Sequence, residues 1–195
     1  MKNIVVIGLK ARKDRWKRCV EIFEKEGIEE VTHYTTLQSF KDTHKHYMKD
    51  FLQMLRIKGK RDLMFFEDDF ELVDGWRDVL DKAMKDLPED WDMLYLGANL
   101  TRPAQRVTDN LVRVKGAWLM HATLLRKEFI DFILKEYKPD QVQIIDEWYR
   151  LIAPERKFYM TYPMVSFQRS DYSDFLGQYV YYDIFENKHY KTLTL

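Results

Sequence analysis

The sequence predicts an α/β fold, with a mainly parallel, twisted central sheet flanked by helices. Two observations predict it. Short apolar runs alternate along the chain with longer segments whose apolar residues recur at helical spacing. Residues 63–66 are apolar at every position, which is typical of a strand buried on both faces of a sheet. The length of 195 residues suits one domain.

The first half of the chain supplies most of the predicted sheet. Strands are expected at residues 3–9, 31–34, 63–66 and 91–96, and helices at 13–26, 41–57 and 75–86. In the first helix, Trp16, Cys19 and Phe23 form one apolar stripe, and Gly27 stands where a helix C-terminal glycine belongs. The third helix must end before Pro88.

The second half is predicted to alternate in the same way. Short strands are expected at residues 111–114 and 117–120. Thr123 can cap a helix over 124–137, and Asp140 can begin another over 140–152. The remaining residues are predicted to form short strands and loops.

Composition excludes several classes of protein. With 46% hydrophobic and 15% aromatic residues, the chain is not disordered, and no apolar run approaches the roughly 20 residues of a membrane span. The apolar start is too short for a signal peptide. One cysteine, Cys19, excludes an internal disulfide framework and a cysteine-built zinc site. These features predict a cytoplasmic protein.

Charge is segregated although the formal net charge is zero. Residues 1–18 hold seven basic side chains and one acid, and residues 41–61 hold seven and two, whereas residues 62–92 hold twelve acids and three basic side chains. Solvated helix faces would explain most of this pattern. It also suits a site with a cationic wall and an anionic floor. The neutral total gives a nucleic-acid partner little support.

Three acids, Glu67, Asp68 and Asp69, directly follow the most apolar strand. The carboxyl ends of strands border the ligand crevice in such sheets. Adjacent carboxylates repel one another, and a hard cation such as Mg²⁺ or Mn²⁺ would relieve the repulsion. Strand alternation would point Glu67 and Asp69 to one side and Asp68 to the other. The alternative is a loop of solvated acids.

Three further features contain candidate site residues. Arg12 and Arg15 follow the first strand and open a helix, where they could bind phosphate or simply be solvated. Asp146 and Glu147 interrupt an apolar stretch, so one of them is a candidate general base, or both are surface acids. His121 ends a strand and could supply a third metal ligand, although its position favours a non-catalytic role.

Taken in order, these blocks resemble glycosyltransferase family 25, which includes lipooligosaccharide galactosyltransferases. The similar segments are residues 6–15, 65–69, 91–97, 116–125, 146–147, Gln168 and 173–174. The block 116–120 reads Gly-Ala-Trp-Leu-Met where the family often has Gly-x-x-Ala-Tyr. The resemblance spans roughly residues 3–176.

The resemblance implies one GT-A (Rossmann-like) domain over residues 1–195, with a donor-binding half to about residue 100 and an acceptor half after it. It implies a nucleotide-sugar donor, a UDP-sugar above all, and Mn²⁺ or Mg²⁺. Glu67 and Asp69, with His121, would hold the metal. The donor would lie against Leu9, Arg12, Arg15, Glu67 and Asp68. Asp146 or Glu147 would deprotonate the acceptor.

The expected activity is therefore the transfer of a hexose to an acceptor hydroxyl with inversion at the sugar's anomeric carbon. Transfer with retention stays open. A nucleotidyltransferase of similar layout and a nucleotide-sugar-binding protein without turnover are the alternatives. The acceptor is open between a glycan or lipooligosaccharide, a protein side chain and a modified base in phage or viral DNA.

Overall fold

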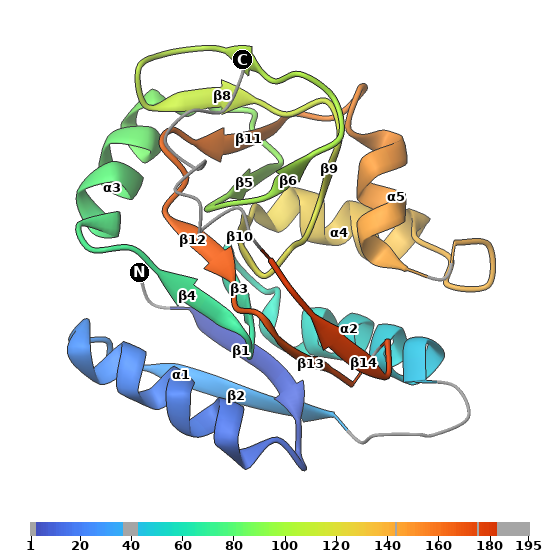
Figure 1. The fold of residues 1–195 in the computed structure, drawn as a ribbon. Helices are drawn as coiled ribbons and strands as arrows, with labels where there is room; N and C mark the ends of the chain where they lie inside the picture. Colours follow the sequence, from blue (N-terminus) through green and yellow to red (C-terminus); the bar gives the residue numbers. More distant parts are fainter. Residues whose placement is uncertain (1–2, 37–42, 143, 175, 183–195) are drawn as a thin grey trace.

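An eight-stranded mixed sheet forms the centre of the computed structural model, which describes residues 3–36, 43–142, 144–174 and 176–182. Its strands are β1 (Ile4–Leu9), β2 (Val31–Thr36), β3 (Leu63–Glu67), β5 (Met93–Tyr95), β7 (Gln105–Arg106), β8 (Leu111–Arg113), β10 (Ala122–Leu125) and β11 (Phe158–Thr161). They lie in the order β2-β1-β3-β10-β5-β11-β8-β7 (Figure 1).

Most strands of this sheet run in one direction. β1 pairs in parallel with β2 and β3, and β5 with β11. β10 lies antiparallel between β3 and β5, and β8 lies antiparallel to β11. Thus β2, β1, β3, β5 and β11 share a direction that β10 and β8 oppose. The predicted α/β class with a mainly parallel sheet is confirmed.

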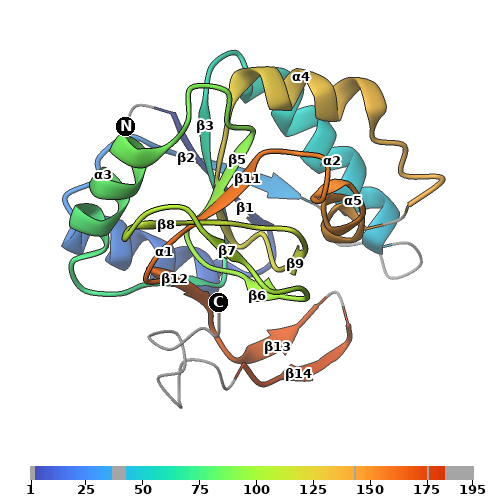
Figure 2. The ribbon, with the colours of Figure 1, turned by 90° about the horizontal axis from the view of Figure 1, so that it is seen from above.

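Helices cover both faces of the sheet (Figure 2). They are α1 (Lys13–Lys25), α2 (Thr43–Lys58), α3 (Trp76–Asp86), α4 (Lys127–Glu136) and α5 (Ile145–Ile152). Alternate residues of β1 face opposite sides: Val6 packs with side chains of α1 and α3, and Val5 with those of α2, α4 and α5. None of the helices in the described ranges is long and apolar enough to cross a membrane.

In the described ranges, three two-stranded sheets lie outside the central sheet. They pair β4 (Phe70–Leu72) with β12 (Ser166–Gln168), β6 (Asn99–Leu100) with β9 (Ala117–Trp118), and β13 (Asp171–Ser173) with β14 (Gln178–Val180). In the β4–β12 pair, Gln168 lies opposite Phe70. A Cβ atom at Gly97, just after β5, would overlap the backbone carbonyl of Ser166. The missing side chain therefore lets β12 pass close to the sheet.

Two predicted helix starts are wrong. Residues 122–125 form β10, so Thr123 is a strand residue, and α4 begins only at Lys127. The apolar residues of this segment recur at helical spacing, but its backbone pairs with β3 on one side and β5 on the other, so it forms a strand. Asp140 lies in a turn, and α5 begins at Ile145.

Candidate functional site

A pocket of about 270 Å³ opens at the carboxyl ends of β1 and β3. Ligand crevices of α/β sheets lie at this edge. Its walls come from these strand ends, α2, the start of α5, the turn before β10 and the segment around β13. The predicted site residues that line it are Leu9, Arg15, Glu67, Asp68, Asp69 and Asp146.

Glu67 at the end of β3 and the two acids after it all line the pocket, so the expectation that Asp68 faces the other way is wrong. β3 ends at Glu67, and residues 68–69 form a turn, which breaks the strand alternation. Glu67 accepts a hydrogen bond from the Tyr47 hydroxyl at 2.8 Å. Burial, and then the neighbouring charges of Asp69 and Asp146, raise the pKa of Glu67 well above its usual value.

Asp68 is held by Arg15, whose Nη1 donates to its Oδ1 at 2.9 Å. Both side chains are buried. Burial raises the pKa of Asp68 to about 6, against the opposing effect of Arg15. Asp68 packs against Gly8 of β1, where a Cβ atom would overlap the carboxylate. Gly8 therefore allows residues 67–69, the acid turn, to lie directly on strand β1.

Asp69 uses one carboxylate oxygen and leaves the other without a partner. Its Oδ2 accepts from Arg15 Nη1 at 3.2 Å and from Gln168 Nε2 at 2.9 Å. Its Oδ1 is buried and has no hydrogen-bond partner. Burial raises the pKa of Asp69, and Arg15 opposes that rise. A buried acceptor oxygen without a donor is a natural point of attachment for a cation.

The two predicted arginines bind acids of the chain itself. Arg12 does not line the pocket and pairs with Asp14 at 2.9 Å, Asp171 at 3.1 Å and Asp174 at 2.6 Å. Arg15 also donates to Asp171 and to the Tyr172 carbonyl. These contacts fasten the β13–β14 hairpin, which projects from the body of the molecule in Figure 2.

Asp146 stands in the first turn of α5 and lines the pocket. Its Oδ2 accepts a hydrogen bond from the Leu119 N–H at 3.1 Å. Leu119 has a φ of 74°, in the left-handed region that a leucine rarely adopts. Desolvation raises the pKa of Asp146 to about 6, and the Leu119 hydrogen bond opposes that rise.

Glu147 does not line the pocket. It pairs instead with Arg150 of its own helix, at 2.7 Å. Hydrogen bonding to Arg150 lowers the pKa of Glu147. Of the two predicted base candidates, only Asp146 therefore reaches the pocket with a raised proton affinity.

His121 lies in a separate cavity of about 20 Å³ next to the pocket. It is fully buried, and burial lowers its pKa to about 4. Within the described ranges, no three His, Cys, Asp or Glu side chains form a group that could hold a metal ion. Glu67 and Asp69 both line the pocket, and Oδ1 of Asp69 is buried without a hydrogen-bond partner. Magnesium sites with one or two carboxylates, completed by phosphate oxygens and water, need no more.

Among the pocket residues that were not predicted as site residues, Tyr47, Leu119 and Gln168 each donate a hydrogen bond to one of the pocket acids. Tyr47 belongs to the apolar stripe of its helix and reads as a core residue. Leu119 and Gln168 act through contacts with Asp146 and Asp69, which lie 27 and 99 residues away along the chain. No local pattern signals such distant pairings.

No protein-family model matches the sequence, and no curated protein matches it. Among solved structures, the chain is similar to A197 from STIV, with 14% identity, a TM-score of 0.49 and coverage of 82% of this chain and 81% of that one. It is also similar to apo UDP-glucose pyrophosphorylase, with 11% identity, a TM-score of 0.48 and coverage of 81% of this chain and 71% of that one. A third similar structure is a glycosyltransferase involved in the glycosylation of the major capsid of PBCV-1, with 8% identity, a TM-score of 0.45 and coverage of 82% of this chain and 81% of that one. Likenesses this distant say nothing about the activity of this chain.

Proposed function

We propose that the chain is a glycosyltransferase that moves a hexose from a nucleotide-sugar donor to an acceptor hydroxyl with inversion. One observation carries the proposal: a single pocket joins an acid turn backed by Arg15 to Asp146, whose pKa is raised to about 6. Sugar transfer requires both parts. The leaving diphosphate needs its charge neutralised, and the incoming hydroxyl needs a base.

The donor would bind on the side of the acid turn. Glu67 and the unpartnered Oδ1 of Asp69 would hold Mn²⁺ or Mg²⁺, and the donor's phosphates would complete the coordination. The cation would neutralise charge on the departing diphosphate. Arg15 already balances Asp68 and Asp69, so its role is to keep two of the three acids ionised beside one another.

The acceptor would enter from the side of Asp146. The Leu119 N–H occupies Oδ2 of this carboxylate, which leaves Oδ1 to take the proton of the acceptor hydroxyl. A base with a pKa of about 6 is ionised at neutral pH and still has enough proton affinity to assist the attack. The acceptor class stays a prediction and is open between a glycan or lipooligosaccharide, a protein side chain and a modified base in DNA.

Product analysis tests this proposal against its alternatives. The protein is incubated with Mn²⁺ and a panel of nucleotide sugars plus glycan acceptors, and separately with nucleoside triphosphates plus sugar phosphates. Release of nucleoside diphosphate in the first arm supports the proposal. Release of pyrophosphate in the second identifies a nucleotidyltransferase instead. Binding of a nucleotide sugar without turnover identifies a binding protein.

Two variants then test the base. Asp146→Asn keeps the shape and the hydrogen bond from Leu119 but cannot take a proton, so transfer should fall by about 10²–10⁴-fold while donor binding persists. Glu147→Gln is the matched neighbour, and full activity is expected because Glu147 pairs outside the pocket. The opposite ranking would assign the base to Glu147.

A further inference from the structure

The small cavity beside the pocket is surrounded by buried polar atoms that have no partner. Leu119, Gln168 and Tyr182 line both this cavity and the pocket, so the two adjoin. His121 also lines it and is 1% exposed, and neither ring nitrogen makes a hydrogen bond of good geometry, although the Ser166 backbone lies near enough to oppose the lowering of its pKa. Gln168 Oε1 is buried and unpartnered as well. Native proteins pair such groups, and ordered water often supplies the partner.

Gln168 has a fixed place and a fixed orientation. Its strand β12 pairs with β4, and the Arg169 N–H donates to the Asp69 carbonyl at 2.9 Å, so the main chain holds it beside the acid turn. Its Nε2 donates to Asp69 Oδ2. Because Oδ2 of Asp69 also accepts a hydrogen bond from Arg15, it is an acceptor toward the amide, so the amide nitrogen faces Asp69 and Oε1 is the unpartnered atom.

The cavity suits one water molecule in size and in chemistry. Its volume of about 20 Å³ exceeds the roughly 10–15 Å³ that a water needs. His121 is buried, and burial disfavours the charged imidazolium, so one ring nitrogen of the neutral ring is an acceptor. Gln168 Oε1 is a second acceptor. A water has two protons to donate and can satisfy both atoms together.

We propose that Gln168 is a positioning residue for Asp69, held by an ordered water that bridges it to His121. Gln168 and Arg15 both donate to Oδ2, which leaves Oδ1 of Asp69 as the oxygen that would hold the cation. His121 then acts through Gln168 and not as a metal ligand. The role in cation binding rests on the proposed function, whereas the water bridge does not.

Cation affinity tests the positioning role. Mn²⁺ binding is measured by calorimetry in the presence of UDP for the wild type, Gln168→Met and His121→Phe, with Gln105→Met on the exposed strand β7 as the matched control. Gln168→Met should bind Mn²⁺ about 10–100-fold more weakly, and His121→Phe more weakly by a smaller factor. The control should match the wild type, and melting curves should show all variants folded.

Two results would overturn the inference while leaving the proposed function intact. One is wild-type Mn²⁺ affinity in Gln168→Met. The other is a complete loss of binding in His121→Phe beside a normal Gln168→Met, which would make His121 a direct ligand. If the wild type binds no Mn²⁺ with UDP, the proposed metal-dependent transfer fails instead.

A crystal structure at high resolution tests the water bridge without any cation. One ordered water is expected within hydrogen-bond distance of Gln168 Oε1 and a His121 ring nitrogen. An empty cavity, or a Gln168 amide turned away from Asp69, would overturn the inference even if Gln168→Met folds too poorly to be titrated.

Discussion

Asp146 combines partial burial with a single backbone donor, and this sets its proton affinity. Its pKa of about 6 lies above the usual value for aspartate, so it is protonated at mildly acidic pH. As the proposed base it works only when ionised. The rate of transfer at low substrate concentration should therefore fall about tenfold per pH unit below about 6 and level off above it. A pH–rate profile at saturating Mn²⁺ measures this, and Glu147→Gln should keep the same midpoint. A flat profile between about pH 5 and 7 would contradict the role of Asp146.

Cys19 illustrates the opposite case, a reactive residue type in an inert place. It is 1% exposed, and its thiol donates to the Asp68 carbonyl at 3.4 Å. Burial and the nearby carboxylates raise the pKa of the Cys19 thiol to about 12. Since only the thiolate reacts, alkylation by iodoacetamide near pH 8 should be about a thousandfold slower in the folded protein than in urea. Mass spectrometry follows the reaction. Equal rates would show that the α1 packing around Cys19 is wrong.

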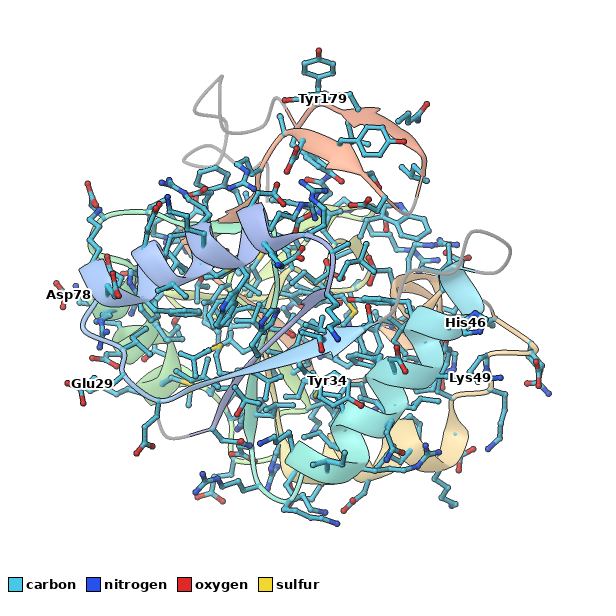
Figure 3. All side chains as sticks on the ribbon, turned by 90° about the horizontal axis from the view of Figure 1, so that it is seen from below. Glu29, Tyr34, His46, Lys49, Asp78 and Tyr179 are labelled. Atoms are coloured by element: carbon cyan, nitrogen blue, oxygen red, sulfur yellow. The ribbon has the colours of Figure 1, made fainter. Side chains whose placement is uncertain are left out.

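At the level of elements, the β13–β14 hairpin is attached mainly through charge. Among the residues that the structure describes, its two strands pair only with each other, and Arg12 and Arg15 bind its acids and one of its carbonyls. Tyr179 lies on the outer side of the hairpin and is half exposed (Figure 3). The attachment matters for the site because Ser173 and Asp174 line the pocket.

Arg12→Ala should therefore loosen the hairpin while leaving the central sheet unchanged. Arg12 is mostly buried among Asp14, Asp171 and Asp174, so its loss leaves the two hairpin carboxylates with fewer cations. Amide exchange across residues 171–180 should rise about tenfold, with no change in β1 or β3. Hydrogen-exchange mass spectrometry measures this. Arg106→Ala, which removes an exposed pair with Asp109, is the control and should leave the hairpin unaffected. Unchanged exchange in Arg12→Ala would mean that packing, not charge, holds the hairpin.

For the whole molecule, the sequence predicts the parts whose signal is local. The apolar run before Glu67 indicates a central strand, and strand order then brings the acids to the edge where β1 also ends. The sequence does not predict β10, since its pairing partners lie about 30 and 60 residues away. For the same reason it does not predict that Asp171 and Asp174 bind Arg12, or that Gln168 binds Asp69. Local sequence patterns therefore predict where the pocket lies. Long-range contacts determine which of its side chains are already paired within the chain.

The raised pKa of Asp146 also predicts that the site weakens the fold. A carboxyl whose pKa is higher in the folded than in the unfolded chain contributes stability below about pH 4, which is lost as pH rises through about 6. A shift of about two units corresponds to about 3 kcal/mol, and partial exposure of Asp146 reduces this to about 1–3 kcal/mol.

Asp146→Asn is uncharged at every pH and keeps an acceptor for the Leu119 N–H. Its free energy of unfolding relative to the wild type should therefore rise by that amount between about pH 4.5 and 8. Urea unfolding of both proteins in EDTA measures the difference, and the chelator removes any contribution from bound cations. A difference that stays constant with pH would show that Asp146 is solvated in the folded chain. A growing difference, together with lost transfer activity, would show that the protein keeps a destabilising carboxylate because the reaction requires it.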